Sequence, residues 1–277
     1  MSLQTLSEWL RCPNCFLPLS PAGPLTLRCG AGHSFDANKR GYVSLVSGGA
    51  RRLLGDSTAM VDARALFLAT GWYKPLRERL AARVAAENPT RVLDVGCGTG
   101  YYLQGVLTRS PDVCALGMDL SPVAVARTVS GRDNIDGLVA DVWSPLPVRD
   151  ASADVILNVF APRNASEFHR VLRKDGILVV VVPQATHLQE LRAAGLALDV
   201  PPNKGDHLSE TLSPAFELET RDLLSSSLRL DPAQASALIG MGPSAHHTDA
   251  EAVAQQLSGL QTVTAAFELL GYRRIPA

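Results

Sequence analysis

The stretch VLDVGCGTG, residues 92–100, decides the fold class of this chain. An apolar run ends in a turn with glycine at positions 96, 98 and 100, and residues 100–109 continue with helical spacing. Glycine lets a ligand approach the backbone, and the N-terminus of the following helix offers free N–H groups. A plain glycine-rich loop is the alternative. The flanking strand and helix favour a ligand-binding turn instead.

Further apolar runs follow this unit, and helical patterns separate most of them. Parallel strands need crossover connections, so this alternation predicts an α/β fold with a mostly parallel sheet covered by helices on both faces. Two late runs are expected to add strands at one edge, the last of them antiparallel. The expected strands are 92–96, 113–120, 137–141, 153–160, 177–183, 225–230 and 262–272, and the expected helices are 57–70, 75–86, 100–109, 121–129 and 164–173.

The spacing of the glycines separates two cofactor classes. A dinucleotide fingerprint, G-x-G-x-x-G, needs glycine where this chain has Tyr101. Here the third glycine comes one residue earlier, at Gly100, and Asp94 precedes Gly96 by two residues. This pattern resembles motif I of the class I S-adenosylmethionine-dependent methyltransferases, whose fold is a Rossmann-like, mostly parallel seven-stranded sheet. The resemblance implies that Asp94, Gly96, Gly98, Thr99 and Gly100 bind the cofactor.

Two acidic residues at the ends of the next strands support that resemblance. Asp119 ends the second expected strand, where the family has a carboxylate for the ribose hydroxyls. Asp141 ends the third, where the family contacts the adenine amino group, with Val142 beside the ring. The alternative is that each carboxylate only caps the turn that follows it.

The fourth strand carries the candidate catalytic residues. Strand ends line the ligand crevice of an open parallel sheet, so Asn158 and Arg163 are expected near the methyl group. Adenine amino-methylating enzymes have Asn or Asp followed by Pro-Pro and an aromatic residue. Asn158 is followed by VFAPR, so that chemistry is not expected. Arg163 can hold a phosphate or a base carbonyl, or be a solvated residue at a helix start. The sequence identifies no general base.

The segment CPNCFLPLSPAGPLTLRCGAGH, residues 12–33, predicts a structural zinc site. Cys12, Cys15, Cys29 and His33 have the number and spacing of ligands for a closed tetrahedral site. Two alternatives are a chance grouping and a redox CxxC, but redox motifs lie in a thioredoxin-like pattern that is absent here. Such a short segment needs a metal to fold. Cys97 and Cys114 are expected to be small buried residues.

Length and charge divide the 277 residues unevenly. Residues 1–52 contain six basic and two acidic residues, a net charge of +4, and the remainder has a net charge of −5. We expect a zinc module at 1–52, a helical connector at 53–88 and a methyltransferase domain at 89–277, with a flexible link near 47–57. No apolar run reaches the ~18 residues that cross a bilayer, and the start lacks a signal-peptide pattern. We therefore expect a cytoplasmic protein with no membrane partner.

Several stretches together are similar to one family. CPNC…CGAGHSFD, KRGYVSLV, GWYKPL, LDVGCGTGYYL, NVFAPRN and THLQEL resemble the bacterial 23S ribosomal RNA guanine-N1 methyltransferases, which join a zinc-binding N-terminal domain to a class I methyltransferase domain. DVWSPLPVRD, NVFAPRN and MGPSAHH look closer to the actinomycete branch that includes the tylosin-resistance methyltransferase than to the Gram-negative branch. Spacing alone assigns no role to Tyr73, His187, His246 or His247.

The resemblance implies more than spacing does. It implies that Tyr73 and His187, with Thr99 and Gly100, contact S-adenosylmethionine, and that the zinc module helps grip a 23S rRNA hairpin as a homodimer. Which guanine is modified stays open. Two other hypotheses remain: a methyltransferase that acts on a small molecule, such as an antibiotic precursor, and a non-catalytic RNA-binding protein.

Overall fold

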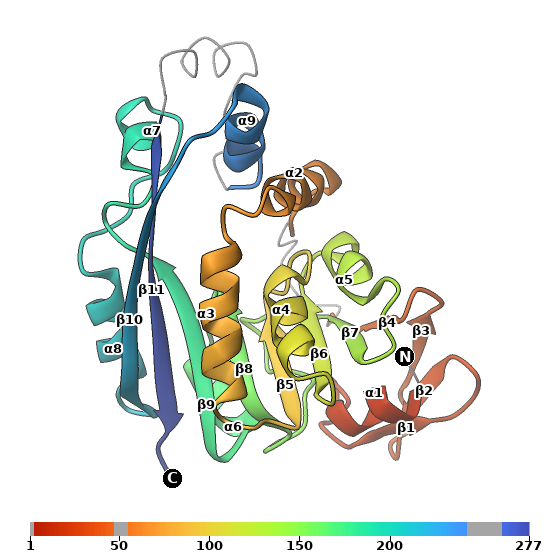
Figure 1. The fold of residues 1–277 in the computed structure, drawn as a ribbon. Helices are drawn as coiled ribbons and strands as arrows, with labels where there is room; N and C mark the ends of the chain where they lie inside the picture. The colour runs from red at the N-terminus through yellow and green to blue at the C-terminus, as the bar shows by residue number, and fades with distance from the viewer. Residues whose placement is uncertain (1–2, 47–54, 243–261, 277) are drawn as a thin grey trace.

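The computed structural model describes residues 3–46, 55–242 and 262–276. One sheet runs through the molecule in the order β1-β2-β3-β4-β7-β6-β5-β8-β9-β11-β10 (Figure 1). The strands after the first four are β5 (Arg91–Val95), β6 (Cys114–Asp119), β7 (Ile135–Val139), β8 (Ala153–Val159), β9 (Leu172–Pro183), β10 (Phe216–Leu228) and β11 (Val263–Arg274). From β7 to β9 every pairing is parallel, and β11 runs antiparallel to both β9 and β10. The expected parallel sheet with an antiparallel last strand is confirmed.

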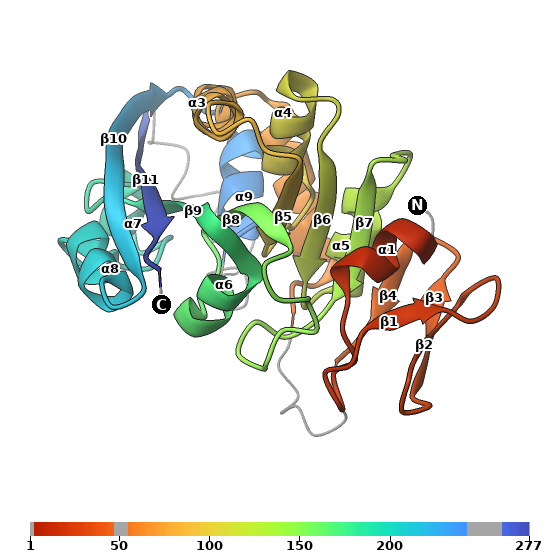
Figure 2. The same cartoon turned by 90° about the horizontal axis from the view of Figure 1, so that it is seen from below.

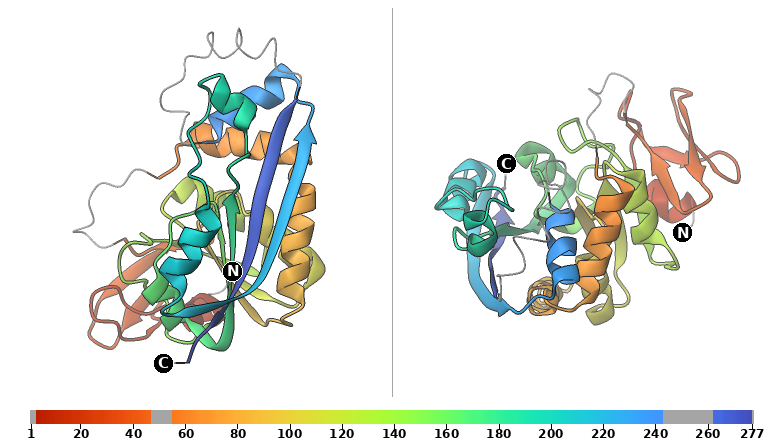
Figure 3. Two further views of the ribbon diagram at one scale, coloured as in Figure 1. Left: turned by 90° about the vertical axis from the view of Figure 1, so that its left-hand side faces the viewer. Right: turned by 90° about the horizontal axis from the view of Figure 1, so that it is seen from above.

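Helices cover both faces of the sheet, so the body has three layers (Figure 2). On one face an apolar core packs side chains of α2 (Thr58–Ala69), α3 (Lys74–Ala85), α4 (Tyr101–Arg109), α5 (Pro122–Val129), α7 (Gln189–Ala193) and α9 (Pro232–Gly240) with strand residues. On the other face a second core packs α1 (Leu3–Trp9), α6 (Ala165–Val171) and α8 (Lys204–Leu212). Both views in Figure 3 show α2 and α9 together at the end where β5 leads into α4.

The N-terminal segment is a continuation of the sheet. It contains β1 (Leu19–Pro21), β2 (Thr26–Cys29), β3 (Ser34–Asn38) and β4 (Tyr42–Ser44), which pair antiparallel in turn. β4 then pairs parallel with β7, aligning Tyr42 with Gly137. A Cβ at Gly137 would lie 2.6 Å from Tyr42 Cβ, so glycine permits this close approach.

The expected count of seven strands is therefore wrong for the sheet as a whole. Seven strands come from the part of the chain after residue 89, and four more come from the N-terminal segment, giving eleven in the described residues. The pairing of β4 with β7 joins residues about a hundred positions apart through a strand of three residues. A strand this short has no periodicity from which the pairing could be predicted.

Some expectations concern residues outside the described ranges. The link at 47–54 lies there, as do His246, His247 and the basic residues Arg51 and Arg52. Among the described residues, no helix is long and apolar enough to cross a membrane.

Candidate cofactor cavity and metal site

A cavity of about 480 Å³ opens at the carboxyl ends of the parallel strands. Its floor is the glycine turn after β5, and its walls are the ends of β6 and β8, the segment after β7 and one side of α2. Six of the ten predicted cofactor residues line it: Gly96, Gly98, Thr99, Asp119, Asp141 and Val142. Strand ends meet at one edge in a parallel sheet, which is why residues from three separate motifs converge here.

The glycines of the turn are required by the backbone. Gly96, Gly98 and Gly100 have φ of +82°, +55° and +74°, a region that residues with a side chain rarely adopt. A Cβ on Gly96 would overlap the side chain of Ala161, and a Cβ on Gly100 would lie 3.0 Å from the Thr128 side chain. The turn can therefore pack against the segment after β8 on one side and against α5 on the other.

Asp119 and Asp94 lie under the turn. Asp119 accepts hydrogen bonds from the backbone N–H groups of Gly98, at 3.0 Å, and of Ser121, at 2.9 Å. Burial raises the pKa of Asp119 even though these two hydrogen bonds act to lower it. Asp94 is 2% exposed, and burial together with the neighbouring charge of Asp119 raises its pKa to about 7. The site thus holds two carboxyl groups in surroundings that favour a positively charged ligand.

Asp141 combines the two roles that the sequence left open. Its Oδ1 accepts a hydrogen bond from Trp143 N at 3.0 Å, and its Oδ2 accepts one from Ser144 Oγ at 3.0 Å. The carboxylate therefore caps the turn after β7, and the residue also lines the cavity with Val142 and Trp143. Asp119 likewise caps the turn after β6, through Ser121 N, and lines the cavity. Capping and ligand binding are compatible, because each carboxylate oxygen has a second lone pair.

Four predicted cofactor residues do not line this cavity: Tyr73, Asp94, Gly100 and His187. Tyr73 is 3% exposed, and its ring meets Phe67 and Phe267 edge-on at 5.0 Å. His187 Nδ1 accepts a hydrogen bond from Ala266 N at 3.2 Å, and burial and nearby cations lower the pKa of its imidazole to about 4. In this arrangement both rings pack within the fold, and their contact with a cofactor stays a prediction.

The two candidate catalytic residues lie behind the cavity wall formed by residues 159–162. Asn158 is fully buried, and its amide donates to Pro162 O at 2.8 Å and to Val95 O at 3.4 Å. These bonds hold the turn in which Phe160 adopts a positive φ of 54°. Arg163 is half-buried, and burial lowers the pKa of its guanidinium. The structure thus brings neither side chain to the cavity, and their roles stay predictions.

Sequence reasoning missed the residues that close the cavity opposite the sheet. Arg64 of α2 forms an ion pair with Asp56 and donates a hydrogen bond to Met241 O at 2.9 Å, and all three residues line the cavity. Trp143 lines it as well and is 62% exposed. Asp56 precedes α2, whose N-cap is Ser57, so no helical periodicity links it to Arg64 in the sequence.

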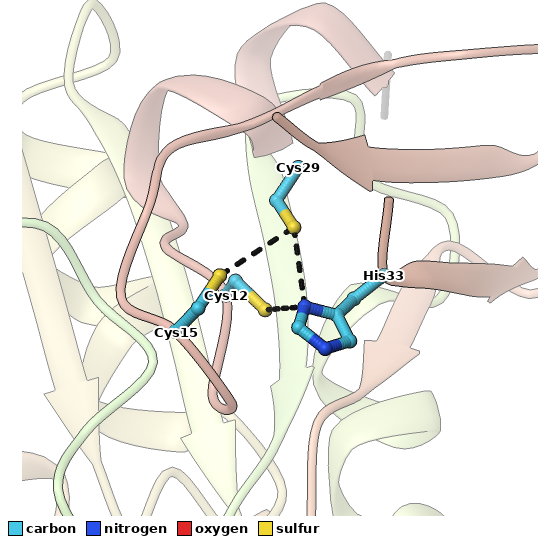
Figure 4. A group of neighbouring side chains, drawn as sticks. All are labelled: Cys12, Cys15, Cys29 and His33. Atoms are coloured by element: carbon cyan, nitrogen blue, oxygen red, sulfur yellow. Dashed lines mark hydrogen bonds between the residues drawn. The ribbon is translucent and has the colours of Figure 1, made fainter. Parts of the chain in front are cut away.

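The four predicted metal ligands converge in the N-terminal segment (Figure 4). Their ligand atoms all lie within 4.8 Å of one another, and His33 Nδ1 lies 3.6 Å from Cys12 Sγ and 3.4 Å from Cys29 Sγ. The sulfur atoms of Cys15 and Cys29 are 3.6 Å apart. Ligands of a tetrahedral zinc ion lie ~2.3 Å from the metal, hence ~3.7 Å from one another. The donor set and its spacing fit zinc.

The pKa values of two cysteines of this cluster shift in opposite directions, that of Cys15 upward and that of Cys29 downward. Burial alone would raise the pKa of Cys29, but its hydrogen bonds with His33 and Cys15 lower it to about 6. A thiolate is the form that binds metal. Outside the cluster, Cys97 is buried as expected, whereas Cys114 is exposed because it is the first residue of β6. The expectation for Cys114 is wrong.

The fold and this cavity define a class I methyltransferase. A methyltransferase domain family matches residues 92–176, and the family "RlmA, N-terminal", a zinc ribbon, matches residues 10–47. The 23S rRNA (guanine(748)-N(1))-methyltransferase of Streptomyces fradiae is 42% identical over 97% of this chain and 98% of its own. The chain belongs to the family of 23S rRNA (guanine-N1) methyltransferases.

Of two further comparisons, one supports the family and the other concerns only the fold. A relative from Micromonospora griseorubida is 40% identical over 96% of this chain and 97% of its own length. Among solved structures, the [4+2]-cyclase SpnF has a TM-score of 0.50 and 23% identity, over 72% of this chain and 82% of its own. That likeness concerns the fold alone.

Proposed function

We propose that this protein transfers a methyl group from S-adenosylmethionine to N1 of a guanine in a 23S rRNA hairpin loop. The observation that carries the proposal is the cavity itself, in which the glycine turn and two carboxylates from neighbouring strands converge. The identity to the Streptomyces fradiae enzyme along almost the whole chain supports the guanine substrate.

The cavity residues suit S-adenosylmethionine. The second oxygen lone pairs of Asp119 would accept the ribose hydroxyls, and Asp141 with Val142 would hold the adenine. Asp94 would favour the cationic methionine end from beneath the turn, since none of the described residues offers an opposite charge to its ionised form. When bound, S-adenosylmethionine supplies an electrophilic methyl group on a sulfonium sulfur.

The protein's part in the reaction is orientation of the base. In the reaction the N1 proton of guanine would pass to water, the N1 electron pair would form the bond to the methyl carbon, and the carbon–sulfur bond would break to leave the neutral thioether S-adenosylhomocysteine. The base must leave its stack to reach the cavity, and the exposed rings of Trp143 and Phe160, which line the cavity, offer surfaces for it. Holding the base in line with the methyl group accounts for much of the rate gain of such enzymes.

We also propose that the cysteine–histidine cluster binds one structural zinc ion and helps grip the RNA. All four tetrahedral positions are filled by protein, so the metal has no open position for catalysis. Arg28, Lys39 and Arg40 are exposed on this segment, and cations of this kind attract a phosphate backbone. We also propose that the chain divides into 1–52, 53–88 and 89–277 and that it assembles as a homodimer. Sedimentation of the zinc-loaded protein tests the dimer.

The direct test is methylation of 23S rRNA from a strain that lacks the modification. Incubation with methyl-labelled cofactor should label the RNA, and mass mapping should place one methyl group on a guanine of the hairpin. No label on this RNA, with cofactor binding intact, would contradict the proposal and favour a small-molecule substrate. If the modification protects the ribosome, deletion of the gene should also alter macrolide susceptibility.

A further inference from the structure

A second hollow lies beside the cofactor cavity, on the other side of Thr99 and Tyr101. It has a volume of about 620 Å³ and is bounded by α2, α3, α4 and α5, which lie together on one face of the sheet (Figure 1). Leu68, Thr99 and Tyr101 line both hollows. We call this second hollow the basic groove. Its polar lining residues include Lys74, Arg77, Gln104, Arg127, Ser130 and Arg132.

The groove is lined by cations and by no carboxylate among these residues. Lys74 and Arg77 come from α3, Arg127 comes from α5, and Arg132 follows α5. The two nearest partners, Glu78 for Lys74 and Asp62 for Arg127, form ion pairs whose members are 43% to 62% exposed. Exposed pairs contribute little and exchange partners readily. The lining therefore keeps an excess of positive charge.

Two of the cations are fixed by the fold. The guanidinium of Arg77 stacks over the Tyr101 ring at 4.5 Å, and its Cγ lies so near Gly105 that a Cβ there would come within 2.5 Å. Arg132 donates hydrogen bonds to Thr128 O at 3.1 Å and Ser130 O at 3.0 Å. Neither guanidinium has an anionic partner among the described residues. A preorganised cation loses little side-chain entropy when an anion binds.

We infer that the basic groove binds the sugar-phosphate backbone of the RNA substrate next to the target guanine. The inference rests on the proposed function. The groove adjoins the cofactor cavity, it is long enough to be bounded by four helices, and its charge matches a polyanion. Phosphate contacts of this kind set the register of a nucleic acid without reading its bases. The N-terminal segment, which joins the sheet through the pairing of β4 with β7, would then not be the only part of the protein that holds the RNA.

The test compares two groove variants with two matched controls. Lys74→Gln and Arg127→Gln each remove an exposed cation of the groove, and Lys174→Gln and Arg109→Gln remove exposed cations outside it. Binding of the 23S hairpin to the full-length zinc-loaded protein is measured by filter retention at several salt concentrations. Each groove variant should bind several-fold more weakly and lower the slope of log K against log salt by about 1. The controls should match the native protein.

Cofactor calorimetry and melting temperature separate this result from misfolding. All four variants should bind S-adenosylmethionine as the native protein does, and Arg127→Lys should restore RNA binding. If the native protein methylates the RNA but the groove variants bind it with the native salt slope, the inference is overturned. The proposed function would then still stand. A native protein that neither binds nor methylates the hairpin would overturn both.

Discussion

The buried carboxyl of Asp94 connects cofactor binding with pH. Burial raises its pKa to about 7, so below pH 7 the ligand-free protein holds it mostly protonated. A bound sulfonium cation favours the ionised form, and binding must then release a proton. The affinity for S-adenosylmethionine should therefore rise with pH through about 7 and level off above it. Calorimetry across pH 5.5 to 8.5 measures this, and a flat profile in the native protein would contradict it.

The same residue affects the stability of the ligand-free protein. An unfolded aspartate has a pKa of about 3.9, so between about pH 4 and pH 7 the folded state binds more protons than the unfolded one. Asp94 therefore reduces stability as pH rises through this window. We expect Asp94→Asn, which mimics the protonated carboxyl, to gain stability relative to the native protein between pH 5 and pH 8. Urea unfolding at pH 5 and at pH 8 measures the free energy of unfolding of both proteins. If the difference between the variant and the native protein were the same at both pH values, this expectation would be wrong.

Two glycines with similar backbone angles make a matched pair. Gly131 has φ +69° and open space around it, so Gly131→Ala should cost only the backbone strain, about 1–2 kcal/mol. Gly96→Ala adds an overlap with Ala161 to the same strain. It should cost more in urea unfolding and lose cofactor binding in calorimetry, whereas Gly131→Ala should bind normally. If both variants lost the same free energy of unfolding and both bound the cofactor normally, the backbone of the glycine turn would have to shift enough to accommodate the added methyl group.

At the scale of elements, we expect the proposed zinc ion to stabilise the N-terminal segment in a graded way. Its strands β1 to β3 pair only with one another and with β4, while β4 also pairs with β7. Removal of zinc with a chelator should therefore speed hydrogen exchange strongly in residues 19–38, less in β7, and little in β5. Exchange measured by mass spectrometry gives the order. If chelation left the exchange rates of all these segments unchanged, the metal would not stabilise the N-terminal segment.

Elements differ in how well the sequence predicts them. The strands β5 to β8 were predicted to within one or two residues, because each is a short apolar run bounded by turn residues. β10 was predicted only over 225–230, yet it extends from Phe216 to Leu228. Most of its residues are at least partly exposed, and its sequence ELETRDLLSSS lacks an apolar run. Pairing with β11 along its length, rather than its own composition, makes it a strand.

At the candidate site, the sequence predicted those cavity-lining residues that belong to motifs at the carboxyl ends of the strands. It did not predict Arg64 or Met241, because they reach the cavity through tertiary packing of α2 and α9. It also could not place Tyr73 and His187, whose surroundings depend on Phe267 of the last strand. Contacts between distant segments leave no local pattern in the chain.

At the scale of the whole molecule, the N-terminal segment and the body share one core. Leu6, Trp9 and Leu10 belong to the same apolar cluster as Leu138 and Val148. Deletion of residues 1–46 should therefore expose this cluster and the edge of β7, leaving a protein that aggregates. The intact zinc-loaded chain should melt in a single calorimetric transition. A soluble truncated protein that binds cofactor normally would show that the two parts are independent.

The parallel pairing of β4 with β7 limits how this enzyme can change over evolutionary time. A module joined by a flexible tether can be exchanged between enzymes as a unit, but one that supplies four strands of the sheet and part of an apolar core cannot. Gly137 illustrates the constraint, since a larger residue there would collide with Tyr42 of β4 and with Val125 and Val129 of α5 at once. Selection for a new RNA target would then act through surface loops and charges, while the N-terminal segment and the body are inherited together.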